Sequence, residues 1–145
     1  MRDTVVVEKV LHATVPEVWN AITDRDQMKE WYFNLEDFRT EKGFIFKFNG
    51  GSDGGPVYVH ICEVTEAIPN RKLTYSWRYE GFPGTSHVTW EIEAKGDNTL
   101  LTLTHTGLDS ISPAGPDFAF ENFKEAWNHF INKALPAYLD LDAKA

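Results

Sequence analysis

Residues 13–33 read Ala-Thr-Val-Pro-Glu-Val-Trp-Asn-Ala-Ile-Thr-Asp-Arg-Asp-Gln-Met-Lys-Glu-Trp-Tyr-Phe, and this stretch encodes two short helices. Thr14 and Glu17 form the pattern Thr-x-x-Glu, in which each side chain satisfies a backbone donor at a helix start. Pro16 suits the first turn of that helix. Apolar residues then recur at steps of three and four, namely Val15, Val18, Trp19 and Ile22. This spacing predicts an amphipathic helix that ends near Thr23.

A second helix follows directly, because Thr23 or Asp24 can cap it and an apolar side continues at helical spacing. That side consists of Met28, Trp31 and Tyr32. The run from Val5 to Leu11, before both helices, has the composition of a first strand. After the helices the hydrophobic period changes from helical to alternating, which predicts antiparallel strands with one face in solvent.

The clearest predicted strand is the run from Lys72 to Tyr79, in which every second residue is apolar. Similar alternation near residues 44–48, 88–94 and 101–106 predicts three more strands. The side chains that share an apolar face in these four runs are Phe44, Phe46, Phe48, Leu73, Tyr75, Trp77, Tyr79, Val88, Trp90, Ile92, Ala94, Leu101, Leu103 and His105. A further strand spans residues 57–66, and its pattern leaves open whether its odd or even residues face inward.

The end of the chain predicts a long helix with one apolar stripe. The stripe consists of Phe120, Phe123, Trp127, Phe130, Ile131 and Ala134. Pro136 lacks a backbone donor, so we expect a kink or an early end there rather than an unbroken helix to Leu141. The element order predicts one α+β domain over residues 1–145, in which a curved antiparallel sheet of about six strands wraps the C-terminal helix.

Composition narrows the function classes. The 145 residues include 14 basic and 22 acidic side chains, a net charge of −8, which disfavours nucleic acid and anionic surfaces. Cys62 is the single cysteine, which excludes an internal disulfide and suits a reducing compartment. The N-terminus becomes charged too early for a signal peptide, and no apolar run is long enough to span a membrane. We therefore expect a cytoplasmic protein.

Five motifs follow one another along the chain, namely Ala13-Thr-Val-Pro-Glu-Val-Trp19 with Trp31-Tyr-Phe33, Gly43-Phe-Ile-Phe46, Ile68-Pro-Asn-Arg-Lys-Leu73, Trp77, and Thr99-Leu-Leu-Thr-Leu-Thr-His-Thr-Gly-Leu108. In this order they resemble the helix-grip superfamily, called SRPBCC, which includes START domains, birch-pollen-allergen-like proteins and polyketide cyclases. Within it, the chain is most similar to the domain family named after the activator of the heat-shock protein 90 ATPase. Where the family usually has Gly-Trp in its terminal helix, this chain has Ala126-Trp127. The resemblance implies the fold, and it implies either ligand binding or a chaperone partner.

A curved sheet and a straight helix leave space between them unless side chains fill it. We expect a ligand cavity there, and its candidate lining residues are Phe46, Tyr75, Trp77, Tyr79, Trp90, His105, Phe123 and Trp127. His105 shares the interior face of Leu101 and Leu103, so it is either a bonded core histidine or a polar group that orients a ligand or moves a proton. Whether the rings line a hole or fill it is left open by the sequence.

The residues predict no metal site, no cofactor and no assigned catalytic residue. His60 and Cys62 share a strand face, but two ligands are too few for a metal. The leading hypothesis is that the domain binds an apolar or aromatic small molecule. The alternative is a co-chaperone-type interaction module with a chaperone partner. An enzyme of the cyclase or hydrolase kind, with His105 as acid or base, ranks third because no triad or carboxylate pair is present.

Overall fold

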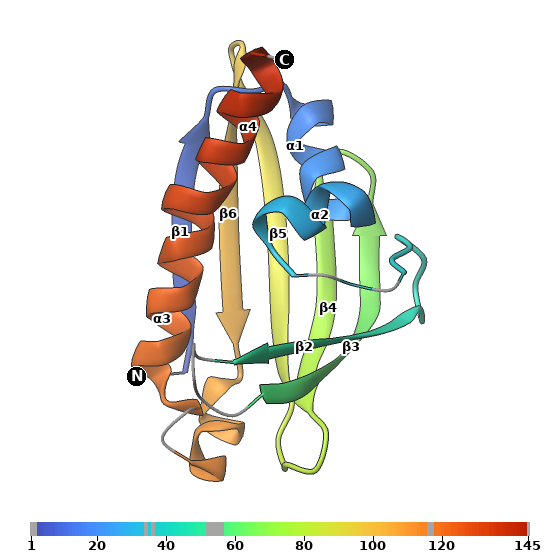
Figure 1. The fold of residues 1–145 in the computed structure, drawn as a ribbon, viewed down its shortest axis with the longest axis vertical. Coiled ribbons are helices and arrows are strands. Elements are labelled where there is room, and N and C mark those ends of the chain that lie inside the picture. Colours follow the sequence, from blue (N-terminus) through green and yellow to red (C-terminus); the bar gives the residue numbers. More distant parts are fainter. Residues whose placement is uncertain (1–2, 34, 36, 52–56, 116–117, 145) are drawn as a thin grey trace.

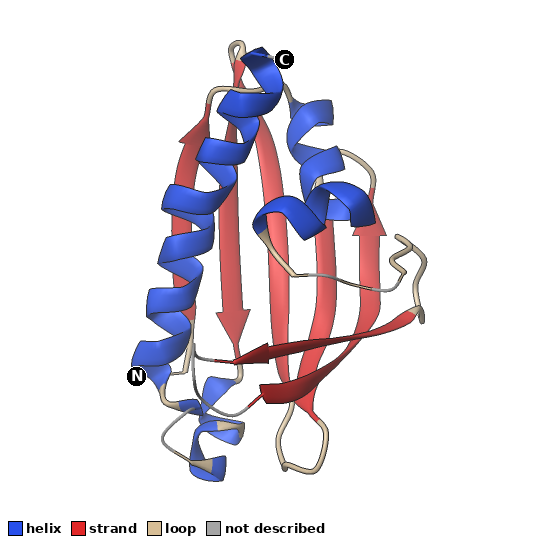
Figure 2. Cartoon of the chain, in the orientation of Figure 1, coloured by secondary structure: helices blue, strands red, loops and turns tan. Residues whose placement is uncertain are grey.

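Six antiparallel strands and a long C-terminal helical segment make up most of the structure (Figures 1 and 2). The computed structural model describes residues 3–33, 35, 37–51, 57–115 and 118–144. Much of the glycine-rich stretch 49–56 lies outside these residues. The elements are β1 (Val5–Leu11), α1 (Val15–Thr23), α2 (Arg25–Trp31), β2 (Ile45–Gly51), β3 (Val57–Ile68), β4 (Lys72–Tyr79), β5 (Ser86–Lys95), β6 (Asn98–Thr106), two short 3-10 turns η1 (Leu108–Ser110) and η2 (Ser112–Ala114), α3 (Phe120–His129), the π-helical turn η4 (Phe130–Ala134) and α4 (Leu135–Lys144).

The described strands are ordered β1-β6-β5-β4-β3-β2 in one sheet, and each neighbouring pair is antiparallel. Figure 1 shows that α3 and α4 run along one face over β1 and β6, while α1 and α2 cover the same face farther along the sheet. The far edge of the sheet, formed by β2 and β3, curls toward the front of this face. This arrangement confirms the predicted helix-grip architecture.

The two short helices begin where the sequence predicts, and α1 ends at Thr23 as expected. Thr14 accepts a hydrogen bond from the backbone N–H of Glu17, and the Glu17 carboxylate accepts one from the backbone N–H of Thr14 (3.0 Å). Asp24 caps α2 by accepting from the backbone N–H of Asp26 (2.9 Å). The indole N–H of Trp31 donates to the carbonyl of Ala21 (2.9 Å), which fixes α2 against α1. These contacts confirm the reciprocal cap that residues 13–33 encode.

Strand parity is confirmed in β4, β5 and β6, whose predicted interior residues are buried except one. Ala94, near the end of β5, is exposed. The buried residues are Leu73, Tyr75, Trp77, Tyr79, Val88, Trp90, Ile92, Leu101, Leu103 and His105. In β3 the structure decides the open question, because His60, Cys62 and Val64 are buried along the even face. Ile61, on the odd face, is also buried, and the register shifts between Val64 and Glu66. This bulge explains why the sequence pattern of β3 is less regular.

The C-terminal helix differs from the prediction at Pro136, because it does not end there. Helical structure continues as α4 to Lys144, and the irregularity lies one turn earlier, in η4. There the N–H of Leu135 bonds to the carbonyl of Phe130, a wider ring than in an α-helix. The π-helical turn directly precedes Pro136, whose backbone nitrogen cannot donate a hydrogen bond, so the chain accommodates this proline without ending the helix.

Within the described residues, no helix is long and apolar enough to cross a membrane.

Candidate functional site

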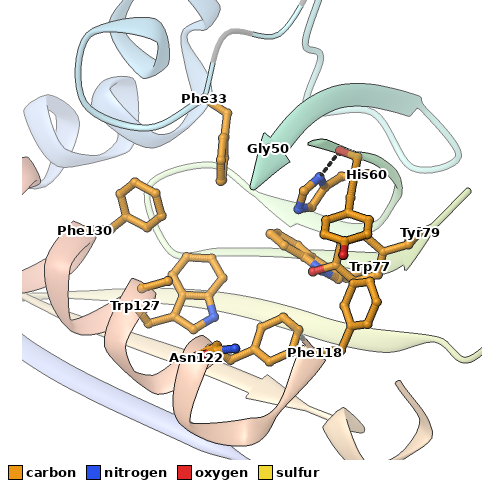
Figure 3. Close-up of a pocket in the computed structure, with 12 residues that line it drawn as sticks. Phe33, Gly50, His60, Trp77, Tyr79, Phe118, Asn122, Trp127 and Phe130 are labelled. Carbon is orange, nitrogen blue, oxygen red and sulfur yellow. Dashed lines mark hydrogen bonds between the residues drawn. The ribbon is translucent and has the colours of Figure 1, made fainter. Parts of the chain in front are cut away.

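A cavity of about 230 Å³ lies between α3 and the end of the sheet where β3 begins and β4 ends (Figure 3). It is partly open to solvent. Four of the eight predicted residues line it, namely Trp77, Tyr79, Phe123 and Trp127. The rest of the aromatic lining was not predicted as part of a cavity, and it consists of Phe33, Tyr58, His60, Phe118 and Phe130. Gly50, Asn122 and Ala126 complete the wall, and Ala126 is exposed on α3.

The other four predicted residues, Phe46, Tyr75, Trp90 and His105, lie in the packed interior instead of lining this cavity. The Tyr75 hydroxyl accepts from the indole N–H of Trp90 (3.1 Å) and bonds to the hydroxyl of Tyr32 (2.9 Å). The ring of Phe46 packs edge-on against Tyr75, with centroids 5.1 Å apart. Tyr32 fills the space that could have extended the cavity to Tyr75 and Trp90, since its ring contacts both Trp90 and Trp127.

His105 is fully buried, and both nitrogens of its ring are bonded. The indole N–H of Trp127 donates to Nδ1 (2.9 Å), so Nε2 carries the proton and donates to the hydroxyl of Ser86 (2.6 Å). Burial lowers the pKa of His105 to about 3, which keeps the imidazole neutral. His105 therefore matches the expected bonded core histidine, with side chains as its partners, and it positions the indole of Trp127 at the cavity wall.

His60 is the imidazole that does line the cavity, and it lies within an aromatic cluster. Its ring stacks on Phe48 (centroids 4.5 Å apart) and contacts Trp77 and Tyr79 at 5.0 Å and 4.6 Å. Nδ1 lies 3.1 Å from the carbonyl oxygen of Tyr58, which can only accept, so Nδ1 carries the proton (Figure 3). Burial lowers the pKa of His60 to about 4, opposed in part by the carbonyls of Tyr58 and Phe48. His60 was not predicted to line the cavity because the sequence pattern left open which face of β3 points inward.

Gly50 lines the cavity at a position where a side chain would not fit. A Cβ atom at this position would lie 2.9 Å from Cε1 of His60 and 3.0 Å from Cε1 of Phe33. Both contacts are shorter than ordinary van der Waals separation. The absence of a side chain lets β2 approach the two rings closely, so Gly50 helps to shape the cavity.

Besides His60, the lining residues with polar side-chain groups are Tyr58, Trp77, Tyr79 and Asn122. The indole N–H of Trp77 donates to the hydroxyl of Tyr79 (3.0 Å), and both residues lie on the inward face of β4. Burial raises the pKa of Tyr79, so its hydroxyl stays protonated at neutral pH.

Burial also raises the pKa of the Cys62 thiol. Among the described residues, no group of three or more His, Cys, Asp or Glu side chains could hold a metal ion.

Comparison with known proteins identifies relatives of the whole fold. The family described as "Activator of Hsp90 ATPase homolog 1-like protein" matches residues 12–140. DynU16, described as a protein in the dynemicin biosynthetic locus, is 25% identical with a TM-score of 0.77, over 95% of this chain and 47% of DynU16. The chain thus spans about half the length of DynU16.

Two further solved structures cover most of their own chains. CalU16 from Micromonospora echinospora is 25% identical with a TM-score of 0.72, over 97% of this chain and 78% of CalU16. Protein MLL2253 from Mesorhizobium loti is 28% identical with a TM-score of 0.75, over 94% of this chain and 96% of MLL2253. No curated protein matches the chain.

Proposed function

Because the chain belongs to the family of Activator of Hsp90 ATPase homolog 1-like proteins, we propose that it uses the fold of that family to bind an apolar or aromatic small molecule. The proposed site is the cavity between α3 and the sheet. The observation that carries this proposal is the wall itself, in which aromatic rings from β3, β4, α3 and the segment after α2 surround one partly open space. Concave, mostly apolar sites with a few polar groups are typical of small-molecule binding.

The volume limits the size of the ligand. An engineered cavity of about 150 Å³ binds benzene, whereas sites for drug-sized ligands occupy roughly 300 to 1,000 Å³. At about 230 Å³, the cavity fits a ligand of one or two fused rings. The origin of DynU16 in a biosynthetic locus supports a small molecule as the ligand. We also place the protein in the cytoplasm, which suits a buried cysteine that has no partner cysteine in the sequence.

A calorimetric titration with naphthalene-sized arenes tests the proposal. Ala126 is exposed at the cavity wall, so Ala126→Trp should obstruct the cavity while leaving the core unchanged. We expect saturable binding to the parent and affinity at least about tenfold weaker in the variant, a change of ~1.4 kcal/mol. The matched control is Ala137→Trp, since Ala137 is an exposed alanine of α4 outside the cavity wall. Equal affinity for the parent and both variants would contradict this location.

The co-chaperone alternative is favoured by the description of the family and by the net charge of −8, which suits a basic partner surface. Its test is binding to a heat-shock protein 90 and a change in the ATPase rate of that chaperone. Ala126→Trp should leave such an interaction unchanged if it uses the outer surface. Ala126→Trp therefore separates the two proposals, because it should weaken ligand binding and leave the chaperone interaction unchanged.

An enzymatic role ranks third. Among the described residues that line the cavity, His60 is the only imidazole, and a base with a pKa of about 4 accepts protons poorly at neutral pH. In this proposal the protonated hydroxyl of Tyr79 is the proton donor of a cyclase or hydrolase reaction at this site. The test is turnover of any ligand found by titration, with loss of turnover in a Tyr79→Phe variant.

A further inference from the structure

The pair formed by Trp77 and Tyr79 leaves one oriented hydrogen-bond donor in the cavity wall. Because the Tyr79 oxygen accepts a hydrogen bond from the indole N–H of Trp77, which has no lone pair to accept in return, the hydroxyl proton of Tyr79 is not used in this pair. Among the described residues, the hydrogen bond from Trp77 is the only one that the Tyr79 hydroxyl makes, so its proton is available to a ligand. The ring of Tyr79 lies between His60 and Phe118, with both centroid separations at 4.6 Å. These contacts hold the donor in place.

The charge of the wall selects against anions. None of the described lining residues is a lysine, an arginine or a carboxylate. His60 is neutral above a pKa of about 4, so it provides no positive charge at physiological pH. A carboxylate that entered would lose its hydration without gaining a counter-charge, and this desolvation is costly. The net charge of −8 also disfavours the approach of an anion.

We propose that Tyr79 determines the ligand specificity of this cavity, and that the ligand is an uncharged aromatic compound carrying a carbonyl or similar acceptor oxygen. This inference rests on the proposed function, because it concerns the same cavity. The acceptor oxygen of the ligand accepts a hydrogen bond from the hydroxyl of Tyr79, and the hydrogen bond from Trp77 strengthens that donation through cooperative polarisation. The aromatic body of the ligand occupies the space among the rings of α3 and β4.

Calorimetric titrations with three bicyclic probes of similar size test this specificity. Indane offers no acceptor, 1-indanone offers a carbonyl, and indane-1-carboxylate is anionic. We expect 1-indanone to bind about tenfold more tightly than indane, and the carboxylate to show no saturable binding. In Tyr79→Phe, the affinity for 1-indanone should fall to that of indane, while the affinity for indane stays unchanged.

Tyr75→Phe is the matched control, because Tyr75 lies on the same strand but its hydroxyl is bonded in the core. This variant should keep the preference for 1-indanone. A second readout uses the parent protein alone and therefore does not depend on whether a variant folds. The indole N–H resonance of Trp77 should move downfield with 1-indanone by more than with indane, because only the ketone polarises the chain of hydrogen bonds.

The outcomes separate the two proposals. If none of the probes binds, the ligand-binding proposal fails. If indane binds as tightly as 1-indanone, or if Tyr79→Phe keeps the preference for the ketone, the cavity stands as a site and the role of Tyr79 is refuted. Binding of the carboxylate at the affinity of the ketone would refute the charge selection.

Discussion

At the scale of residues, two buried histidines have different roles. His105 is bonded between Trp127 and Ser86 and does not line the cavity, whereas His60 does. The sequence predicted the interior position of His105 from strand parity, but parity cannot say how far along a strand a cavity lies. Tyr32 limits how far the cavity extends along the strands, because its ring fills the space next to Trp90 and Trp127. Such packing depends on the path of the chain after α2, which no local pattern encodes.

The same histidines make stability depend on pH. Burial lowers the pKa of His60 to about 4 and that of His105 to about 3, from the ordinary histidine value of 6.5. The unfolded chain therefore binds more protons below pH 6.5, and stability is lost as pH falls. Between pH 6.5 and pH 5, each imidazole should reduce the free energy of unfolding by about 2 kcal/mol.

Urea denaturation across this pH range measures the effect. His60→Gln and His105→Gln should each flatten the pH dependence relative to the parent, since a glutamine does not titrate. His12 and His129 lie on the exposed surface, so His12→Gln or His129→Gln is the matched control and should keep the parental slope. A free energy of unfolding that stays constant from pH 6.5 to pH 5 would contradict the neutral, buried state of both rings.

At the scale of elements, the sequence predicted most of the architecture because periodicity and capping are local. The boundaries of β1 and of both short helices follow from residues 5–33, and the inward residues of β4 to β6 follow from alternation. The prediction did not specify the inward face of β3, where a bulge interrupts the alternation. Of the two expected outcomes at Pro136, a kink or an early end, the early end is wrong, because α4 continues to Lys144; the α-helical pattern is interrupted one turn earlier, in η4.

The contact between α3 and the sheet yields a second prediction. Trp127 is buried, packs against Trp77 and Trp90, and donates to His105. Trp127→Ala should lower the free energy of unfolding by about 3 to 5 kcal/mol, the range for truncating a buried aromatic side chain. Chemical denaturation measures it. Glu125→Ala, at an exposed position of the same helix, is the control and should change stability by less than about 0.5 kcal/mol. A parental midpoint for Trp127→Ala would exclude its role in packing.

At the scale of the whole molecule, the family and the fold are shared with relatives. Charge, capping and periodicity follow from composition and local sequence, and they predicted an acidic helix-grip protein. The position of the cavity depends on how elements far apart in sequence meet, namely the segment after α2, the tips of β2 and β3, and α3. This is why half of the predicted lining residues lie in the cavity and half in the core.

The most direct test of the central claim is a titration of the isotope-labelled protein with indane, followed through the indole N–H resonances of its five tryptophans. Trp77 and Trp127 line the cavity, whereas Trp19 lies on α1 outside its wall. If the cavity is the ligand site, the resonances of Trp77 and Trp127 shift along one saturable curve and that of Trp19 stays fixed. Unchanged resonances for Trp77 and Trp127 at saturating indane, or shifts only at Trp19, would contradict the assignment of this cavity.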